Sequence, residues 1–382
     1  MKNSKFRTSL IIILSLLTMI VGQASFSLSG ETSLKEQIDQ TARSLGKITE
    51  SRNRILKDQE NYPAGSSQGD WTAIVLALSG KDDDYASYLK RLEDYVSNSY
   101  QEQGYLDSFR ATEYHRIALT VLALGGNPQE FGLDKEGNLI DLIADGTYSF
   151  HGESLGQQGS NGLIYGLLAL NSKDYNIPSE SKFTFEEMLD ELLSSYSPEG
   201  GLSLGRGVSP AQDLTAMSIQ ALAPYRDRAQ VDGAISESLK WLSLQLSERA
   251  SLGFGDRDSC ESTAQLVLAL CALGIDPEES EEFRVGDLSV LDGLNSFRNQ
   301  DGTYSHNIGD DEGDLMASQQ ALLALEALNS LREEDRWIFD FRDYSFETKT
   351  GSQALVLIMG PVLVGLVLVL TFANIKRKSR GR

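Results

Sequence analysis

Asp258 and Cys260 stand directly before the apolar segment "ESTAQLVLALCALG", which the sequence predicts to be a buried helix. An Asp-x-Cys pair at the start of a helix has three chemical interpretations: two ligands of a zinc ion, the start of a reactive thioester, or a helix cap. A thioester needs a glutamine three residues after the cysteine, but Thr263 stands there and Gln265 is five residues away. The spacing excludes the thioester and leaves the other two interpretations open.

The same apolar segment occurs six times along the chain, and these copies are the elements that would position such residues. Each copy surrounds a central Ala-Leu pair, and the copies are spaced 46 to 55 residues apart. The central alanines are Ala77, Ala123, Ala169, Ala221, Ala269 and Ala324. Because each copy is apolar on nearly all faces, we expect six helices that are buried on every side.

Amphipathic segments alternate with the apolar copies. They lie at residues 33–57, 83–100, 137–146, 184–197, 231–248 and 286–299. A helix pair repeated six times predicts an all-α fold over residues 34–340, an α6/α6 toroid with a double ring of six inner and six outer helices. An open superhelical array is the alternative, but its end repeats usually carry polar caps, whereas the terminal copies here are as apolar as the central ones.

One position near the start of the apolar copies, eight residues before each central alanine, is polar in the four middle copies. It holds Gly69, His115, Asn161, Asp213, Glu261 and Met316. These residues either cap their own helices or surround the mouth of a central cavity. In the second interpretation the ligand-binding candidates are His115, Asn161, Asp213 and Glu261, together with Asp70, Tyr114 and Asp258.

Both ends of the chain carry membrane-targeting patterns. Residues 1–24 combine a basic start, an apolar run and small residues, as a secretory signal peptide does. Residues 354–375 are uncharged and long enough for a transmembrane helix, and the basic tail 376–382 is expected in the cytoplasm. With 341–353 as a linker, the sequence predicts a single-pass cell-membrane protein of a Gram-positive-like bacterium, with its N-terminus outside.

The net charge is −21, and it is more negative still over the predicted extracellular part because both ends are basic. Such a surface repels nucleic acid, so nucleic-acid binding is excluded and cationic or neutral partners are expected. Cys260 and Cys271 are predicted to lie on one helix about 16 Å apart, too far for a disulfide.

The segments "DLTAMSIQALAPY", "WLSLQ", "ESTAQLVLALCALGIDP" and "MASQQALLALEAL" resemble the α/α toroids of the terpenoid cyclase and protein prenyltransferase superfamily. Within it, the chain is most similar to the prenyltransferase/squalene-oxidase-repeat ectodomains of bacterial surface proteins. The resemblance implies the toroid fold over most of the chain. It does not fix an activity, because the superfamily contains enzymes, cobalamin carriers and thioester domains.

The resemblance also implies what a metal site or a cyclase site would need. In the prenyltransferases, zinc is held by an Asp-x-Cys pair and a histidine from the next inner helix, so Asp258 and Cys260 match the first two ligands. The third falls at Ala317, which cannot ligate, and His306 lies in the preceding loop. Class II terpene cyclases use the middle acid of D-x-D-D, which Asp213 matches without its flanking carboxylates.

The sequence therefore favours a surface binding or interaction module, with an unidentified small ligand or another surface protein as partner. Cobalamin is a possible cofactor only by the resemblance, and zinc only through the incomplete set Asp258, Cys260 and His306. The alternative is a divergent cyclase-like or prenyltransferase-like enzyme outside the membrane, with Asp213 as its candidate catalytic acid. An enzyme would need an aromatic-lined central pocket, for which Trp71, Tyr114 and Tyr165 are the available large residues.

Overall fold

A computed structural model describes residues 32–51, 54–205, 207–254 and 257–346. The chain divides into two units, Met1–Gln37 and Ile38–Arg382, of which the first contributes only the start of helix α2 (Leu34–Ile48) to the described residues. The predicted signal peptide at 1–24, the transmembrane segment at 354–375 and the tail at 376–382 lie outside these residues. Among the described residues, no helix is long and apolar enough to span a membrane.

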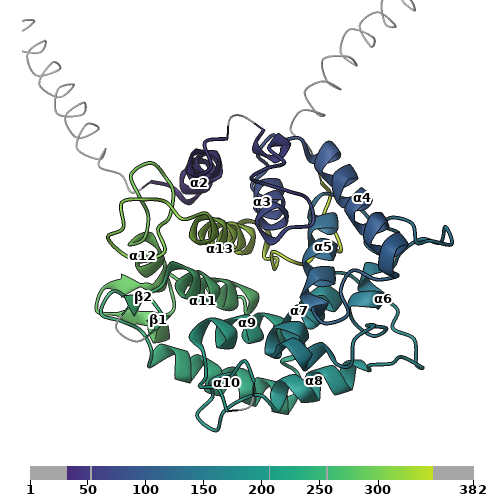
Figure 1. The fold of residues 1–382 in the computed structure, drawn as a ribbon. Coiled ribbons are helices and arrows are strands. Elements are labelled where there is room, and N and C mark those ends of the chain that lie inside the picture. Colours follow the sequence, from purple (N-terminus) through teal and green to yellow (C-terminus); the bar gives the residue numbers. More distant parts are fainter. Residues whose placement is uncertain (1–31, 52–53, 206, 255–256, 347–382) are drawn as a thin grey trace, which may run out of the picture. The chain divides into compact units, whose positions relative to one another are not determined.

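The described residues contain twelve α-helices, and six of them coincide with the apolar copies of the sequence. They are α3 (Ser67–Leu78), α5 (Ala111–Ala123), α7 (Ser160–Asn171), α9 (Gln212–Leu222), α11 (Cys260–Ala272) and α13 (Leu315–Glu334). Each packs against the next in chain order, and α13 packs against α3. The six inner helices of the second unit thus form a closed ring (Figure 1).

The amphipathic segments form the remaining helices, which lie outside the ring (Figure 1). After α2 these are α4 (Tyr85–Gln103), α6 (Leu142–Gly146), α8 (Phe185–Leu193), α10 (Ala229–Ser243) and α12 (Val290–Asn295). Helix α6 begins at Leu142 rather than at residue 137, because Asp141 caps it there and Leu139 pairs with Leu133 in an isolated bridge. The end of α6 packs very closely on α5. A Cβ atom at Gly146 would lie 2.6 Å from Tyr114 Cβ, so only glycine permits this approach.

Short loops tie several inner helices to the outer ring through one buried residue each. The backbone N–H groups of Leu202, Leu252 and Tyr304 each donate to the hydroxyl group of the fourth residue of an inner helix. These acceptors are Thr215 in α9, Thr263 in α11 and Ser318 in α13. All three side chains are fully buried. Each of these contacts fixes where its inner helix begins.

The segment after α13 crosses the carboxyl ends of the inner helices. Phe341 N–H donates to Ser172 O at 2.8 Å, and Tyr344 Oη donates to Ala123 O at 3.0 Å. Phe339 and Phe341 are buried. The packed part of the chain thus extends to Phe346, past the boundary at residue 340 that the sequence predicts, and this segment closes one end of the ring.

Extended structure is minor within the described residues, as the repeat pattern predicts. Two hairpins pair β1 (Gly253–Phe254) with β2 (Arg257–Asp258), and β3 (Arg284–Val285) with β4 (Leu288–Ser289). Short 3₁₀ helices at 55–57, 155–158, 223–225 and 281–283 occupy other connections. The fold is mostly helical, and its ring leaves a hollow whose walls carry the candidate site.

Candidate functional site

A deep chamber of about 420 Å³ lies inside the ring of inner helices. Its walls carry the aromatic rings of Trp71, Tyr165 and Phe339, together with aliphatic side chains such as Met217 and Leu268. Trp71 lies 6.1 Å from Tyr165 and 6.4 Å from Phe339, measured between ring centroids. Phe339 comes from the segment that crosses the carboxyl ends, so it forms the floor of the chamber. The volume is within the range of small-molecule sites.

A second cavity of about 370 Å³ lies toward the amino ends of the inner helices, and we call it the mouth. Its lining is more polar and includes Glu113, Arg116, Asn161, Asp213 and Glu261. Six residues line both the mouth and the chamber: Ser67, Trp71, Tyr165, Met217, Gln265 and Gln320. The two cavities therefore share part of their lining, and the mouth is the more polar of the two.

The second residue of every inner helix lines one of these cavities. These residues are Gln68, Thr112, Asn161, Asp213, Glu261 and Met316. The sequence-based candidates Asn161, Asp213 and Glu261 are in this set. They are not helix caps, because the caps of their helices are Gly159, Ala211 and Ser259. The capping interpretation is thus wrong for these three residues.

Asp213 places a carboxylate at the mouth. This carboxylate has no ion-pair partner among the described residues. Its Oδ1 accepts a hydrogen bond from its neighbour's amide, Leu214 N–H, at 2.8 Å. Tyr165 lines the same cavity, and burial, with the charge of Asp213 as the second cause, raises the pKa of its hydroxyl to about 12. The phenol is therefore neutral, while Asp213 supplies negative charge to the mouth.

Asn161 adds an acceptor to the same cavity. Its Oδ1 is buried and has no hydrogen-bond partner among the described residues. A buried acceptor without a donor is costly, so a donor group on a ligand would find a favourable position here.

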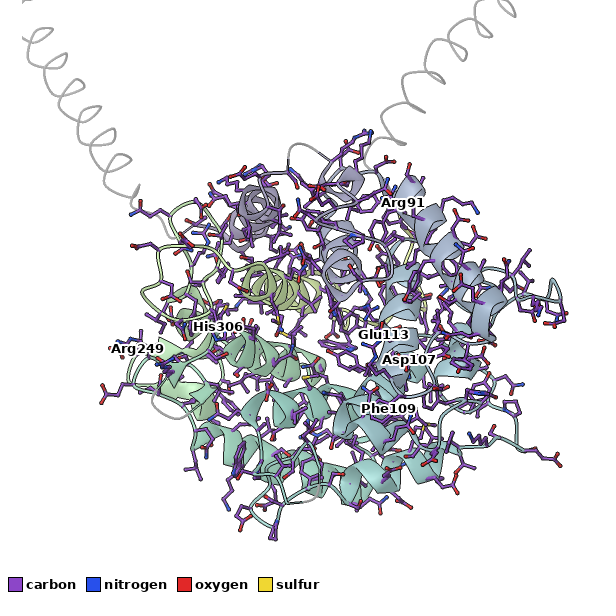
Figure 2. The ribbon with its side chains drawn as sticks, in the orientation of Figure 1. Arg91, Asp107, Phe109, Glu113, Arg249 and His306 are labelled. Carbon is purple, nitrogen blue, oxygen red and sulfur yellow. The ribbon has the colours of Figure 1, made fainter. Side chains whose placement is uncertain are left out.

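Glu261 lies on the mouth wall and is paired with His306. The imidazole Nδ1 is 2.8 Å from Glu261 Oε2, and the Glu261 side chain is 13% exposed. Hydrogen bonding to Glu261 raises the pKa of His306. His306 precedes α13 beside α11, whereas Glu113 is on α5, so the two residues lie across the ring from each other (Figure 2).

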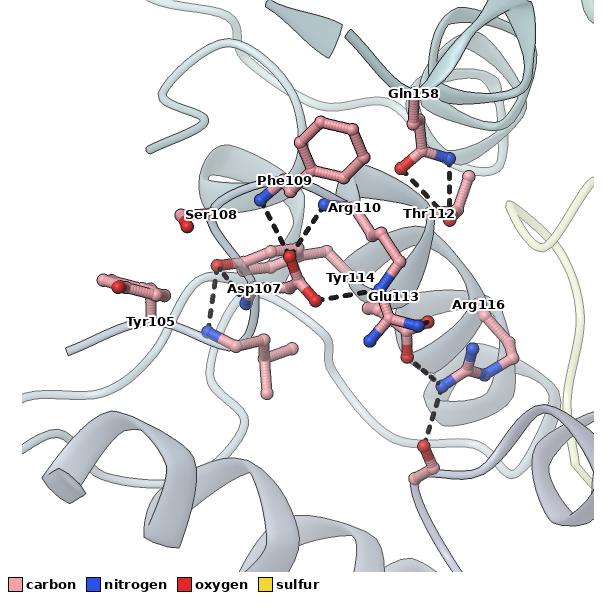
Figure 3. A network of polar contacts seen from close by, with 12 residues as sticks. Tyr105, Asp107, Ser108, Phe109, Arg110, Thr112, Glu113, Tyr114, Arg116 and Gln158 are labelled. Atoms are coloured by element: carbon pink, nitrogen blue, oxygen red, sulfur yellow. Dashed lines mark hydrogen bonds and ion pairs between the residues drawn. The ribbon is translucent and has the colours of Figure 1, made fainter. Parts of the chain in front are cut away.

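A chain of charges runs along α5 to the opposite wall of the mouth (Figure 3). Asp107 accepts from Arg110, Glu113 lies between Arg110 and Arg116, and Arg116 Nε donates to Asp70 at 2.9 Å. Asp70 is fully buried and also accepts from the Tyr88 hydroxyl and from Gly65 N–H. Asp70 is therefore a structural partner of Arg116 and does not reach the cavities.

The structure does not bring His115 or Tyr114 to the mouth. Helix α5 begins at Ala111, so His115 is its fifth residue rather than its second and points away from the ring centre. His115 Nε2 hydrogen-bonds to Gly146 O, and burial lowers the pKa of the imidazole to about 4. The Tyr114 hydroxyl accepts from the N–H groups of Leu106 and Asp107, and Tyr114 lines neither cavity.

The possible zinc ligands do not form a ligand set. Asp258 pairs with Arg249 at 3.3 Å, and the His306 side chain is paired with Glu261. Cys260 is fully buried with its Sγ against Ala317 O at 3.8 Å, and burial raises the pKa of its thiol. Within the described ranges there is no group of three or more metal-ligating side chains.

Sequence reasoning missed two parts of the site. Phe339 lies beyond the last repeat, where no periodic signal exists. A chain of glutamine amides, Gln220, Gln265 and Gln320, lies on the chamber wall. A signal for these glutamines was present, because each is a polar residue inside an otherwise apolar copy.

No family model matches the chain, and no curated protein matches it. Solved structures that are similar to it include the following two. Protein geranylgeranyltransferase-I from Candida albicans, complexed with GGPP, aligns with a TM-score of 0.49 and 10% identity over 79% of this chain and 92% of its own. A type II terpene cyclase from Scytonema, in its apo form, aligns with a TM-score of 0.46 and 14% identity over 78% of this chain and 98% of its own. The neighbours thus include a protein prenyltransferase and a terpene cyclase, the two classes named in the resemblance.

Proposed function

We propose that this protein is a binding module whose toroid holds one amphiphilic small molecule. The apolar body of the ligand lies in the deep chamber, and a cationic head lies at the mouth. The observation that carries the proposal is an aromatic-walled chamber that shares six lining residues with a mouth, where the carboxylate of Asp213 has no ion-pair partner among the described residues.

The chamber supports the apolar half of the ligand. Aromatic and aliphatic side chains form much of its wall, beside several glutamines and Asp314. Transfer of apolar surface from water to the apolar part of this wall contributes about 25 cal/mol per Å². Phe339 closes the far end, so the ligand enters from the mouth, apolar end first.

The charges support a cationic head. Arg116 at the mouth is already engaged by Asp70 and Glu113, so it does not attract an anion. Glu261 is engaged by His306. Among the described residues Asp213 at the mouth has no ion-pair partner, and neither has Asp314, which lines the chamber. A cation beside Trp71 and Tyr165 would also gain from the aromatic faces.

The aromatic walls also support the alternative, a cyclase-like or prenyltransferase-like enzyme. Trp71, Tyr165 and Phe339 are suited to carbocations as well as to bound cations. Asp213 is the candidate acid, but its Oδ1 accepts from a backbone amide, and no second carboxyl group among the described residues donates to it. Because an alkene-protonating acid needs such a neighbouring carboxyl group, we favour binding over proton donation.

We further propose that the module is held at the cell surface by a membrane segment at 354–375, with its N-terminus outside. The support is the sequence pattern at both ends of the chain. A tethered carrier would capture amphiphiles close to the membrane, where such molecules partition.

The test uses three probes with one apolar chain and different heads: decylamine, decanol and decanoate. Isothermal titration calorimetry with the purified full chain should give affinities in the order amine, alcohol, carboxylate. Equal affinities for amine and carboxylate would contradict a cationic head, and an absence of binding by all three would remove the proposal. Mass spectrometry of each probe after incubation distinguishes the alternative, because an enzyme would release a changed product.

A further inference from the structure

The wall of the chamber carries three glutamine side chains joined in one hydrogen-bonded chain, and two of them, Gln265 and Gln320, also line the mouth. Gln220 Nε2 donates to Gln265 Oε1 at 2.8 Å, and Gln265 Nε2 donates to Gln320 Oε1 at 3.1 Å. The three residues come from the neighbouring inner helices α9, α11 and α13. We call this set the amide chain.

The direction of the amide chain follows from one further contact. Gln220 Nε2 also lies 3.4 Å from the backbone carbonyl oxygen of Gln265, which can only accept. The amide group of Gln220 must therefore point its nitrogen toward α11, and Gln265 must accept with its oxygen. This leaves Gln265 Nε2 as the donor to Gln320, so the NH₂ group of Gln320 is the terminal donor of the chain.

That terminal donor faces the cavities. Gln320 lines both the chamber and the mouth, and its Nε2 donates to no described residue. Gln220 and Gln265 are 3% and 7% exposed, so the first two amides are held in place by burial. Donors in such a chain polarise one another, which strengthens the last one.

We infer that the ligand carries a neutral acceptor oxygen, the carbonyl of an amide or ester, between its apolar body and its cationic head, and that Gln320 recognises it. This inference rests on the proposed function and specifies the ligand class. The position follows from the lining: Gln265 and Gln320 belong to both cavities, so they lie where the apolar part ends and the head begins.

The test compares two probes of equal backbone length, the decanoyl amide of ethylenediamine and tridecylamine. Both have one cationic end, but only the first has a carbonyl group between the chain and the head. The affinity ratio of the two probes is measured by calorimetry on the full chain and on Gln320→Leu. Each ratio contains the same cost of removing the probes from water, so the change between the two proteins reports the contact with Gln320.

A single hydrogen bond of this kind predicts that the ratio falls roughly three- to tenfold in Gln320→Leu. The matched control is Gln101→Leu, the same change at an exposed residue of the outer helix α4 that lines neither cavity, and its ratio should equal that of the wild type. Thermal melts check folding, and Gln320→Met replaces Gln320→Leu if the latter does not fold.

The outcomes separate the inference from the proposed function. If both probes bind the wild type and the ratio is the same in Gln320→Leu, the inference is overturned while the binding module stands. An equal fall in Gln101→Leu would also overturn it, because the effect would then not depend on the amide chain. If neither probe binds the wild type, the proposed function falls and takes this inference with it.

Discussion

The imidazole of His306 lies 2.8 Å from the Glu261 carboxylate at the mouth of the cavity. Hydrogen bonding to Glu261, and then its charge, raises the pKa of His306, and Asp314 and Asp310 add to this from the same side. The pair therefore stabilises the folded protein fully below the unfolded pKa of about 6.5, and this contribution is lost as the pH rises through the folded pKa. Because the His306 side chain is 56% exposed, the effect on unfolding free energy should stay below about 1 kcal/mol.

Binding of decylamine should change with pH in the opposite sense. As His306 loses its proton above pH ~6.5, Glu261 regains an uncompensated charge, and the affinity for the cation should rise. His306→Gln should remove this dependence. Buried His115, whose pKa is lowered to about 4, does not titrate in this window. A wild-type affinity that stays constant between about pH 6 and 8.5 would contradict the role of the pair.

Asp213→Asn combined with Glu261→Gln should leave the fold intact and weaken cation binding. Both residues occupy the second position of their helices, where the loss of a charge costs about 0.3–1 kcal/mol through the helix dipole, and relief of repulsion between the acids offsets part of this. Thermal melts should be close to those of the wild type, while decylamine affinity falls several-fold.

The control for this double variant is Asp232→Asn in the first turn of the outer helix α10, which removes charge away from the mouth. It should leave decylamine affinity unchanged. Marked destabilisation of the double variant with unchanged affinity would show that the two acids are structural.

How far the sequence predicted this site depends on the helix starts. The apolar copies identified all six inner helices, because a helix buried on every side has an unmistakable composition. Counting back from the central alanine placed Asn161, Asp213 and Glu261 correctly on the cavity wall, since their helices begin at the same distance. It failed for His115, because α5 begins earlier and Thr112 takes the equivalent position. Phe339 could not be predicted, because its place depends on the path of a non-repeating segment.

Phe339→Ala should deepen the chamber and destabilise the fold. Phe339 is 3% exposed and contacts Trp71, so its removal should cost roughly 3–5 kcal/mol by chemical denaturation. Tetradecylamine should gain affinity relative to decylamine, because the floor is removed. Phe341→Ala is the matched control: this residue is equally buried in the same segment but does not line the chamber, so chain-length preference should stay as in the wild type.

Neither cysteine should react with a thiol reagent in the native protein. Cys260 and Cys271 are 0% and 3% exposed, and burial raises the pKa of both thiols, which keeps the reactive thiolate scarce. Titration with a colorimetric disulfide reagent should detect both thiols only after denaturation.

The zinc content of the purified protein is a separate measurement, and Cys260→Ser should have the same zinc content as the wild type. Stoichiometric zinc that disappears in Cys260→Ser would contradict this assignment.

The central claim is that the ligand body occupies the chamber, and Trp71 offers a direct measurement. In a protein with Trp241→Phe and Trp337→Phe, Trp71 is the remaining tryptophan, and it lines the chamber. A decylamine brominated along its chain should quench this emission saturably, at the concentration at which calorimetry detects binding. Binding by calorimetry without quenching of Trp71 would place the ligand elsewhere and contradict the account.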